Sequence, residues 1–301
     1  MLIWDVLGCG MSDLFPGFDS QRLPIDDFEI HFRSAGKGPP LLLLHGYPET
    51  HVCWHRVAPR LAESFSLVLP DLPGYGNSSF LEPDEANRRY SKRNMAAVMA
   101  GLMQALGHER FALVGHDRGA RVAYRMALDR PHLVERLALL DITPTIEEWE
   151  SFDKKEALAT FHWPFLAQPG GLPERLILAE SDLFLRYLMH RWAGDPTRID
   201  SDALAEYLRC FRLDSVIRAS CADYRAGAST DSEDDAADRA AGKRIACPLL
   251  LLWGSGRGDL LPVWRRWADD VRGEAIDSGH FLQEEAPEEV LARLLPFLQA
   301  G

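Results

Sequence analysis

Asp117 stands in the stretch "LVGHDRGARV", with Gly115 two residues before it and Gly119 two residues after it. An apolar run of the buried-strand type precedes this stretch, and a pattern of helical period follows it. Small residues on both sides permit a sharp strand-to-helix turn, because larger side chains would clash with the neighbouring backbone. The pattern therefore predicts a turn that presents the Asp117 carboxylate as a nucleophile. The alternative is that Asp117 only caps the following helix.

Two further residues follow in the order acid, then base. Asp141 comes directly after the apolar run Leu137–Leu140, and His280 lies in "DSGHFL" near the C-terminal end. A histidine oriented by a carboxylate can act as a general base. Asp259, in the Gly-rich loop after Trp253, is a second candidate for that carboxylate. We expect Asp141 to be the partner, because it adjoins the end of its strand, whereas Asp259 lies several residues into its loop.

A carboxylate nucleophile favours a particular kind of chemistry. It attacks acyl carbon poorly, but it can displace a leaving group from a saturated carbon and so become an alkyl ester. Water deprotonated by His280 can then attack the carbonyl carbon of Asp117, while backbone N–H groups hold the oxyanion. We expect these N–H groups to come from Tyr47, in "HGYP", and from Arg118. Dehalogenation and epoxide opening both fit this scheme.

Two arginines accompany the nucleophile. Arg118 is adjacent to Asp117, and Arg121 lies one helical turn beyond it. Arginine is rarely buried without a partner, so one alternative is that both side chains reach the surface or form structural ion pairs. If they line the pocket, their guanidinium groups make a fork-shaped receptor for a carboxylate. The substrate would then be a small acid with a leaving group on the carbon next to its carboxylate.

Short apolar runs alternate with helical patterns over much of the chain. Helical periodicity marks Met95–Leu106 and Arg121–Asp129. This alternation predicts an α/β fold with a mostly parallel sheet flanked by helices, and with chemistry at the carboxyl ends of the strands. The expected strands contain Leu41–Leu44, Leu67–Leu69, Ala112–Val114, Leu137–Leu140 and Leu249–Trp253.

The alternation breaks between residues 145 and 240. No strand-like run occurs there, while helical patterns such as "SDLFLRYLMHRW" begin at residues suited to N-caps. We therefore predict a core domain of residues 1–144 and 241–301, and an inserted helical cap domain of residues 145–240. The acidic run "TDSEDDAAD" near the end of this segment is expected to be a solvated loop.

The charge balance limits the classes of partner. The chain has 301 residues, a formal net charge of -12 and a pI near 5.3, so its field repels phosphate and we expect neither nucleic acid nor membrane as a partner. The apolar runs are too short to cross a bilayer. A signal peptide begins with a basic region, but no Lys or Arg precedes Arg22 in this sequence. The five cysteines lie far apart and form no metal-binding pattern, which indicates reduced thiols in a cytoplasmic protein.

Several stretches together resemble the fluoroacetate dehalogenases of the α/β-hydrolase superfamily. The resemblance extends from about Phe15 to Phe297 and includes both the core and the cap. It is specific at Arg118, where haloalkane dehalogenases and most epoxide hydrolases carry Trp, and it departs at Tyr47, where Phe is more usual. The stretches are "LLLLHGYPETHVCWHRVAPRLAE", "DLPGYGNSS", "LVGHDRGARVAYRMALDRP", "LLDITPT", "FHWPFLAQP", "CADYRAGA" and "SGHFLQEEAP".

The resemblance implies an α/β-hydrolase fold with an inserted helical cap, and it implies roles for the candidate residues. Asp117 would be the nucleophile, and Asp141 and His280 would complete the triad. Arg118 and Arg121 would hold the carboxylate of the substrate. The resemblance also implies no metal and no organic cofactor, and often a homodimer.

The resemblance further implies that His162, Trp163 and Tyr224 bind the departing halide. Imidazole, indole N–H and phenol O–H groups are donors that can solvate fluoride in a site closed to water. Without the resemblance, we would interpret these aromatic residues as packing within the cap. Trp192, in "HRWAGDP", is a further candidate for the pocket wall, with cap packing as the alternative.

Three functions remain under consideration from the sequence. The first is hydrolysis of a small anionic haloacid, fluoroacetate or chloroacetate, to glycolate and halide. The second is an epoxide hydrolase, which needs two cap tyrosines to protonate the ring oxygen; Tyr187, Tyr207 and Tyr224 are available. The third is a ligand receptor without turnover, because a fold does not guarantee activity. The arginine pair favours the first, since it has no role in epoxide opening.

Overall fold

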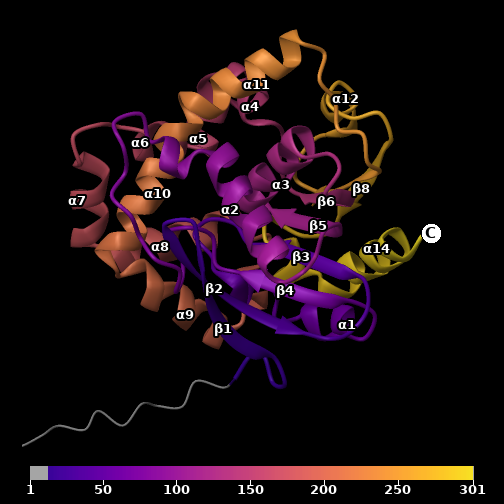
Figure 1. The fold of residues 1–301 in the computed structure, drawn as a ribbon. Coiled ribbons are helices and arrows are strands. Elements are labelled where there is room, and N and C mark those ends of the chain that lie inside the picture. The colour runs from indigo at the N-terminus through magenta and orange to yellow at the C-terminus, as the bar shows by residue number, and fades with distance from the viewer. Residues whose placement is uncertain (1–12, 301) are drawn as a thin grey trace, which may run out of the picture.

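The computed structural model describes residues 13–300 of the chain. Cys9 and the other residues of the N-terminal dozen, for which the sequence suggested no role, lie outside this part. Within it, a central sheet is flanked by helices, and a further group of helices gathers on one side of the molecule (Figure 1).

One sheet of eight strands forms the centre of the described structure, in the order β1-β2-β4-β3-β5-β6-β7-β8. The strands from β3 to β8 run parallel to one another, whereas β2 pairs antiparallel with both β1 and β4. This arrangement confirms the predicted mostly parallel sheet. The strands are β1 (Asp19–Ile25), β2 (Phe28–Ala35), β3 (Pro40–Leu44), β4 (Ser66–Pro70), β5 (Phe111–His116), β6 (Val134–Leu140), β7 (Leu249–Gly254) and β8 (Val271–Ile276).

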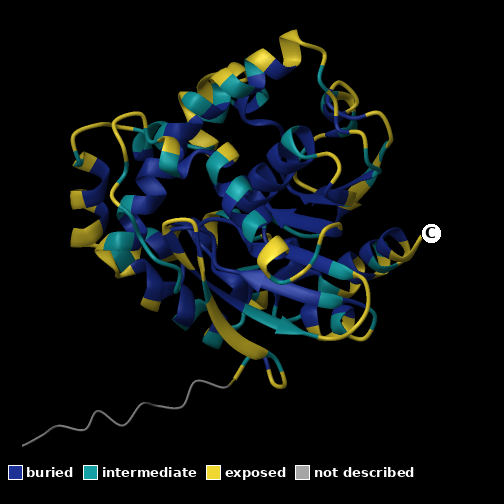
Figure 2. Cartoon of the chain, in the orientation of Figure 1, coloured by how far each residue is buried: buried dark blue, intermediate teal, exposed yellow. Residues whose placement is uncertain are grey.

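All five predicted apolar runs lie in strands of the parallel part of the sheet. β5 and β7 are buried at every position, as expected for strands that are covered on both faces. The first two strands, β1 and β2, were not predicted. β1 lies at an edge and is largely exposed (Figure 2), and histidine and arginine interrupt the apolar residues of β2. Neither strand therefore contains the continuous apolar run on which the prediction rested.

The core helices cover both faces of the sheet: α2 and α3 lie on one face, and α1 and α14 lie on the other (Figure 1). α3 begins where β5 ends and packs against β5 and β6. The two predicted helices correspond to α2 and α3. The helices of this part, with η marking 3-10 helices, are η1 (His51–Trp54), α1 (Ala58–Ala62), η2 (Arg88–Tyr90), α2 (Lys92–Ala105), α3 (Asp117–Asp129), α12 (Leu261–Trp264), α13 (Leu282–Glu285) and α14 (Pro287–Gln299).

Residues 145–240 are described throughout, and every element assigned to them is helical. This segment lies between β6 and β7 in the chain. It reaches the carboxyl ends of the strands, because the carbonyl of Trp192 accepts a hydrogen bond from the backbone N–H of His280 at 2.9 Å. Its helices are α4 (Thr145–Glu150), α5 (Lys154–Ala159), α6 (His162–Leu166), α7 (Leu172–Ala179), α8 (Ser181–Trp192), η3 (Pro196–Arg198), α9 (Ser201–Phe211), α10 (Asp214–Gly227) and α11 (Thr230–Ala240).

The acidic run "TDSEDDAAD" is helical, so the prediction of a solvated loop was wrong. It forms most of α11, and its residues Asp231, Asp235 and Asp238 are buried. Their spacing places these carboxylates on one face of the helix, and that face meets Lys92 and Arg125. Lys92 and Arg125 precede these aspartates by between 110 and 139 residues in the chain. The acidic run alone therefore does not show that its carboxylates form ion pairs.

Among the described residues, no helix combines the length and the apolar character that a membrane crossing requires. The cysteines within residues 13–300 are free thiols: Cys53, Cys210 and Cys221 are buried, and Cys247 is half-buried.

Candidate active site

Asp117 is the first residue of α3 and directly follows His116, the last residue of β5. Its φ of +46° lies in the left-handed region, which residues other than glycine seldom adopt. A Cβ on Gly119 would stand 2.3 Å from the carbonyl oxygen of His45, so glycine is required for this close approach. The predicted sharp turn is present, and the N-cap position of the helix belongs to His116 rather than to Asp117.

The Asp117 carboxylate is buried between two groups of the site. Its Oδ1 accepts a hydrogen bond from the backbone N–H of Tyr47 at 2.7 Å, and its Oδ2 lies 3.8 Å from Nε2 of His280. Burial opposes ionisation, but the nearby His280, His116 and Arg118 outweigh it and hold the pKa of Asp117 below its usual value. The carboxylate is thus ionised, as a nucleophile must be. The Tyr47 N–H is directed at the carboxylate of Asp117, and the oxyanion roles of the Tyr47 and Arg118 N–H groups stay predictions.

His280 is paired with Asp141. Nδ1 of His280 lies 2.6 Å from Oδ2 of Asp141, whose Oδ1 accepts a hydrogen bond from the N–H of Gly254 at 2.9 Å. Asp141 directly follows β6 and has a φ of +58°, so both acids of the site lie in left-handed backbone. Asp259 is exposed and accepts a hydrogen bond from the N–H of Leu261 instead. Of the two candidate acids, the structure therefore places Asp141 against the histidine.

Arg257 lies beside Asp141, in the Gly-rich loop after β7. Its Nη1 donates to the backbone carbonyl of Asp141 at 2.9 Å and lies 3.6 Å from Oδ2. Burial favours the protonated form of Asp141, but Arg257 and His280 outweigh it and hold the pKa of this carboxyl below its usual value. Asp141 is therefore ionised and can stabilise a protonated His280. Nothing in the sequence singled out Arg257.

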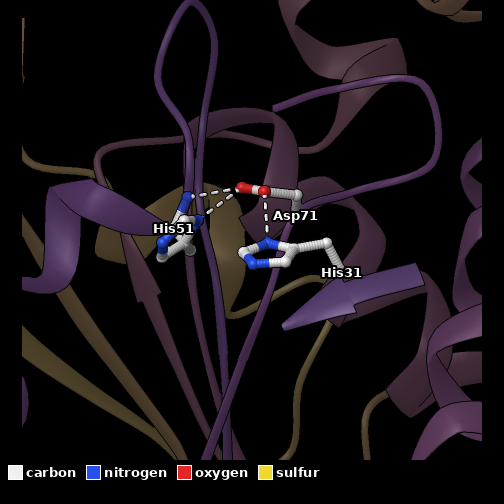
Figure 3. A group of neighbouring side chains, drawn as sticks. All are labelled: His31, His51 and Asp71. Atoms are coloured by element: carbon white, nitrogen blue, oxygen red, sulfur yellow. Dashed lines mark hydrogen bonds and ion pairs between the residues drawn. The ribbon is translucent and has the colours of Figure 1, made fainter. Parts of the chain in front are cut away.

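The loop that carries Tyr47 is anchored by Asp71, which follows β4. The Asp71 carboxylate accepts hydrogen bonds from Nδ1 of His31 at 2.9 Å and from Nδ1 and the backbone N–H of His51 at 2.8 and 2.9 Å (Figure 3). Burial opposes ionisation, but the two histidines outweigh it and hold the pKa of Asp71 well below its usual value.

The same three residues, His31, His51 and Asp71, bring their possible ligand atoms within 4.8 Å of one another. A metal could bind there only by replacing the hydrogen bonds that already join the two imidazoles to the carboxylate. The cluster therefore anchors the Tyr47 loop to the sheet, and its ligand atoms are already occupied by hydrogen bonds with one another.

A cavity of about 980 Å³ lies over the triad, and Asp117, Asp141 and His280 form part of its wall. Loops of the core and helices of residues 145–240 both contribute to the wall. Glu148 and Arg257, which the sequence did not single out, also line the cavity. Four other predicted residues do so as well: Arg121, His162, Trp163 and Trp192.

The two arginines predicted to bind a carboxylate are placed differently. Arg118 is fully buried, and its Nε and Nη2 donate to the carboxylate of Asp223 at 3.0 and 2.5 Å. Arg121 lines the cavity, and its Nη1 donates to the carbonyl of Thr143 at 2.8 Å. The fork of two arginines facing the pocket is therefore not formed in this structure. Asp223 lies 105 residues beyond Arg118 in the chain, so the sequence did not show that this guanidinium has a partner of its own.

His162 and Trp163 line one side of the cavity, and Tyr224 packs against both. The ring centroids of His162 and Trp163 are 5.5 and 5.8 Å from that of Tyr224, and the Trp192 ring lies 4.5 Å from His162. Burial lowers the pKa of His162 to about 3, so the imidazole is neutral and keeps one N–H donor. Tyr224 is buried and does not itself line the cavity. The group supplies aromatic surface and polar hydrogens without adding a charge.

The chain matches the model of the alpha/beta hydrolase fold family over residues 39–287. It is 41% identical to a fluoroacetate dehalogenase from Burkholderia sp over 293 residues, which cover 95% of each protein. It is 35% identical to a soluble epoxide hydrolase from a Corynebacterium species, over 91% of this chain and 94% of the relative. A crystal structure from Nostoc sp PCC 7120, solved as a candidate alpha/beta hydrolase, has a TM-score of 0.92 and 47% identity and covers 94% of this chain and 99% of that one.

Proposed function

The chain belongs to the alpha/beta hydrolase fold family, and from this premise we propose that it hydrolyses the carbon–halogen bond of a small 2-haloacid. Fluoroacetate and chloroacetate are the first candidate substrates, with glycolate and halide as products. The observation that carries this proposal is an ionised carboxylate, Asp117, at the turn where an acyl hydrolase would need a hydroxyl. Arg121 in the same cavity wall offers a cation for the carboxylate of the acid.

In the first step, Oδ2 of Asp117 attacks the carbon that bears the halogen. The new C–O bond forms as the carbon–halogen bond breaks, and its electron pair leaves with the halide. Oδ2 suits this role because Tyr47 already holds Oδ1. Arg121 would keep the carboxylate of the substrate fixed, so that the carbon stays in line with the attacking oxygen. The product of this step is an ester on Asp117.

In the second step, His280 removes a proton from water, and the resulting hydroxide attacks Cγ of Asp117. The negative charge then develops on Oδ1, where the Tyr47 N–H lies within hydrogen-bonding distance. Collapse of this intermediate breaks the bond between Cγ and Oδ2 of the ester. Glycolate leaves with Oδ2, which takes the proton from His280. The oxygen of the water replaces Oδ2 in Asp117, and the remaining proton of that water passes to solvent as the carboxyl group ionises again. Asp141, at 2.6 Å, stabilises the protonated His280 between these transfers.

We propose that the leaving halide is held by His162 and Trp163, which line the cavity, with Tyr224 packed against both rings. Nδ1 of His162 is buried and has no hydrogen-bond partner among the described residues, so a bound halide would satisfy it. Fluoride is a poor leaving group, and hydrogen bonds to it must lower the barrier by about a few kcal/mol. The neutral imidazole of His162 supplies a donor for this purpose.

An epoxide hydrolase is the second candidate function. The similarity to the epoxide hydrolase of the Corynebacterium species favours it, and so does the pairing of Arg118 with Asp223, which leaves that arginine less available to a carboxylate. Against it, Tyr207 is buried and its hydroxyl donates to Glu284, and Tyr187 is half exposed. Of the three cap tyrosines, Tyr224 is the one that packs beside the cavity residue His162. The pair of acids required for epoxide opening is therefore not assembled among these three.

The deciding experiment is halide release from fluoroacetate and from chloroacetate, followed with an ion-selective electrode for wild type and Asp117→Asn. Release of fluoride that requires Asp117 supports the proposal in full. Release of chloride alone keeps the ester mechanism and places the difficulty in the halide site. If neither halide appears, an epoxide should be tried, and lack of turnover there would favour a receptor that keeps the fold without catalysis.

A further inference from the structure

A carboxylate of the chain itself lies beside the arginine that would receive the substrate. Glu148, in α4, is buried and lines the cavity. Its Oε2 lies 3.7 Å from Nη2 of Arg121 and 3.7 Å from Nη2 of Arg257. The hydroxyl of Thr143 donates to the same oxygen at 2.5 Å and so fixes its position. The cluster contains two guanidinium groups and one internal carboxylate.

We propose that Glu148 is a specificity-determining residue that competes with anionic substrates for Arg121; the proposal rests on the proposed function, in which Arg121 holds the carboxylate of a haloacid. A substrate carboxylate on Arg121 must either approach the charge of Glu148 or displace it. Both cost binding free energy in a cavity partly shielded from water, because like charges at short range repel each other more strongly there.

The contacts of Arg121 show that it still has a donor to offer. Its Nη1 is engaged by Thr143, while its Nε is buried and lacks a hydrogen-bond partner within the described part of the chain. The 3.7 Å separation from Glu148 exceeds a hydrogen-bond distance, so the internal carboxylate neutralises the guanidinium without saturating it. The site therefore accepts an acid, but with a weaker preference for charged over neutral ligands than an arginine without Glu148 would show.

Glu148→Gln tests the proposal, because glutamine has the same size and keeps an oxygen to accept from Thr143. We expect the KM for chloroacetate to fall about fivefold to tenfold, with kcat changed less than twofold. Chloroacetamide, the neutral counterpart, should show no such gain. An unchanged or higher KM for chloroacetate, or an equal gain for chloroacetamide, would overturn the proposal.

Glu156→Gln is the matched control. Glu156 lines the same cavity and interacts with Arg257 and Glu148 at longer range, but it forms no ion pair with Arg121 or Arg257 among the residues described. Its replacement removes the same charge from the cavity and leaves the cluster intact, so the KM for chloroacetate should change less than twofold. A fall in KM as large as that of Glu148→Gln would show that the total charge of the cavity sets the affinity. That result would overturn the proposal that Glu148 competes locally for Arg121.

A binding measurement separates this inference from the proposed function. In an Asp117→Asn background, acetate and acetamide can be titrated by ligand-observed NMR without any turnover. Tighter acetate binding after Glu148→Gln, with acetamide unaffected, supports the competition even if wild type releases no halide and the dehalogenase proposal fails. Equal acetate affinity with and without Glu148 overturns the inference even if halide release succeeds.

Discussion

The two ends of α3 carry charged residues that serve different purposes. Asp117, Arg118 and Arg121 lie at the N-terminal end, in the cavity wall or buried against Asp223. Arg125 and Asp129 lie at the C-terminal end, where they form ion pairs. Both groups belong to one helix that is almost entirely buried, so burial alone does not distinguish them. They differ in how completely their polar atoms are satisfied.

At the C-terminal end the polar atoms are used in mutual contacts. Arg125 donates from Nη2 to Asp235 at 2.7 Å and from Nη1 to Asp238. The hydroxyl of Tyr124 donates to the second oxygen of Asp235 at 2.8 Å. Buried charges are tolerated when partners of this kind offset the cost of leaving water. This end of the helix joins α3 to α11, and within residues 13–300 no buried side-chain donor of Tyr124 or Arg125 lacks a partner.

At the N-terminal end several donors have no partner. Nη1 of Arg118, Nε of Arg121 and Nδ1 of the neighbouring His162 are buried without hydrogen bonds in residues 13–300. An unsatisfied buried donor costs about 1–3 kcal/mol. Arg121 and His162 line the cavity, so their unpaired atoms agree with the proposed ligand site, whereas Arg118 lies outside the cavity wall. The contrast within α3 therefore separates a binding end from a structural end.

Asp117→Asn is the strongest test of the binding end. Turnover should fall by at least about 10⁴-fold, because asparagine cannot form the ester. Asparagine has the same size and an oxygen for the Tyr47 N–H, so the circular dichroism spectrum should stay that of the wild type. The rate is measured as halide release at saturating chloroacetate. Retained turnover would show that Asp117 is not the nucleophile.

His280→Asn should stop the reaction after its first step. The ester on Asp117 can form without a base, but its hydrolysis requires His280, so steady-state turnover should fall by about 10³-fold or more. Mass spectrometry after incubation with chloroacetate should show a carboxymethyl group on the protein. The double variant with Asp117→Asn is the control and should carry no adduct. Loss of turnover without an adduct would contradict the covalent route.

Arg125→Met tests the structural end. Removal of Arg125 leaves Asp235 without its cation and Asp238 with Lys243 alone among the described residues, so we expect the free energy of unfolding to fall by about 3–5 kcal/mol. The kcat of the folded protein should change less than twofold. Urea unfolding gives the first quantity and halide release the second. Arg93→Met is the control, because Arg93 is 46% exposed and its loss should cost less than about 1 kcal/mol.

Local patterns made much of this helix predictable. Gly115 and Gly119 around Asp117 indicated the turn, because backbone packed this closely excludes a side chain. The apolar runs located the five central strands, and the short distance from a strand end favoured Asp141 over Asp259. In each case, a few neighbouring residues contain the physical cause, so one sequence is enough to expose it.

The remaining features depend on partners far away in the chain. The burial of Arg118 depends on Asp223, and the helix that replaces the predicted acidic loop depends on Arg125 and other cations. The charge next to Arg121 comes from Glu148, whose position depends on how α4 leaves the sheet. A single sequence shows the residue types but not these pairings, because charge–charge contacts across the fold have no local signature.

The smallest expected effect concerns the pH dependence of the structural end. Burial opposes ionisation of Asp129, but hydrogen bonds from Arg93 and Lys243 outweigh it and lower its pKa to about 2. Because the folded pKa lies below the unfolded value of about 3.9, this carboxylate stabilises the fold above pH 4, and the contribution is lost as the pH falls toward 2.

Asp129→Asn should therefore reduce the free energy of unfolding by about 1–2 kcal/mol at pH 7, and by progressively less between pH 4 and 2. Urea unfolding of wild type and Asp129→Asn across this pH range measures the difference in their free energies of unfolding. The other carboxylates titrate in both proteins, so their contributions largely cancel in this difference. The kcat at pH 7 should be unaffected, because Asp129 lies at the opposite end of α3 from Asp117. A constant difference in stability would show that Asp129 acts through packing alone, and a large loss of kcat would show that the two ends of the helix are not independent.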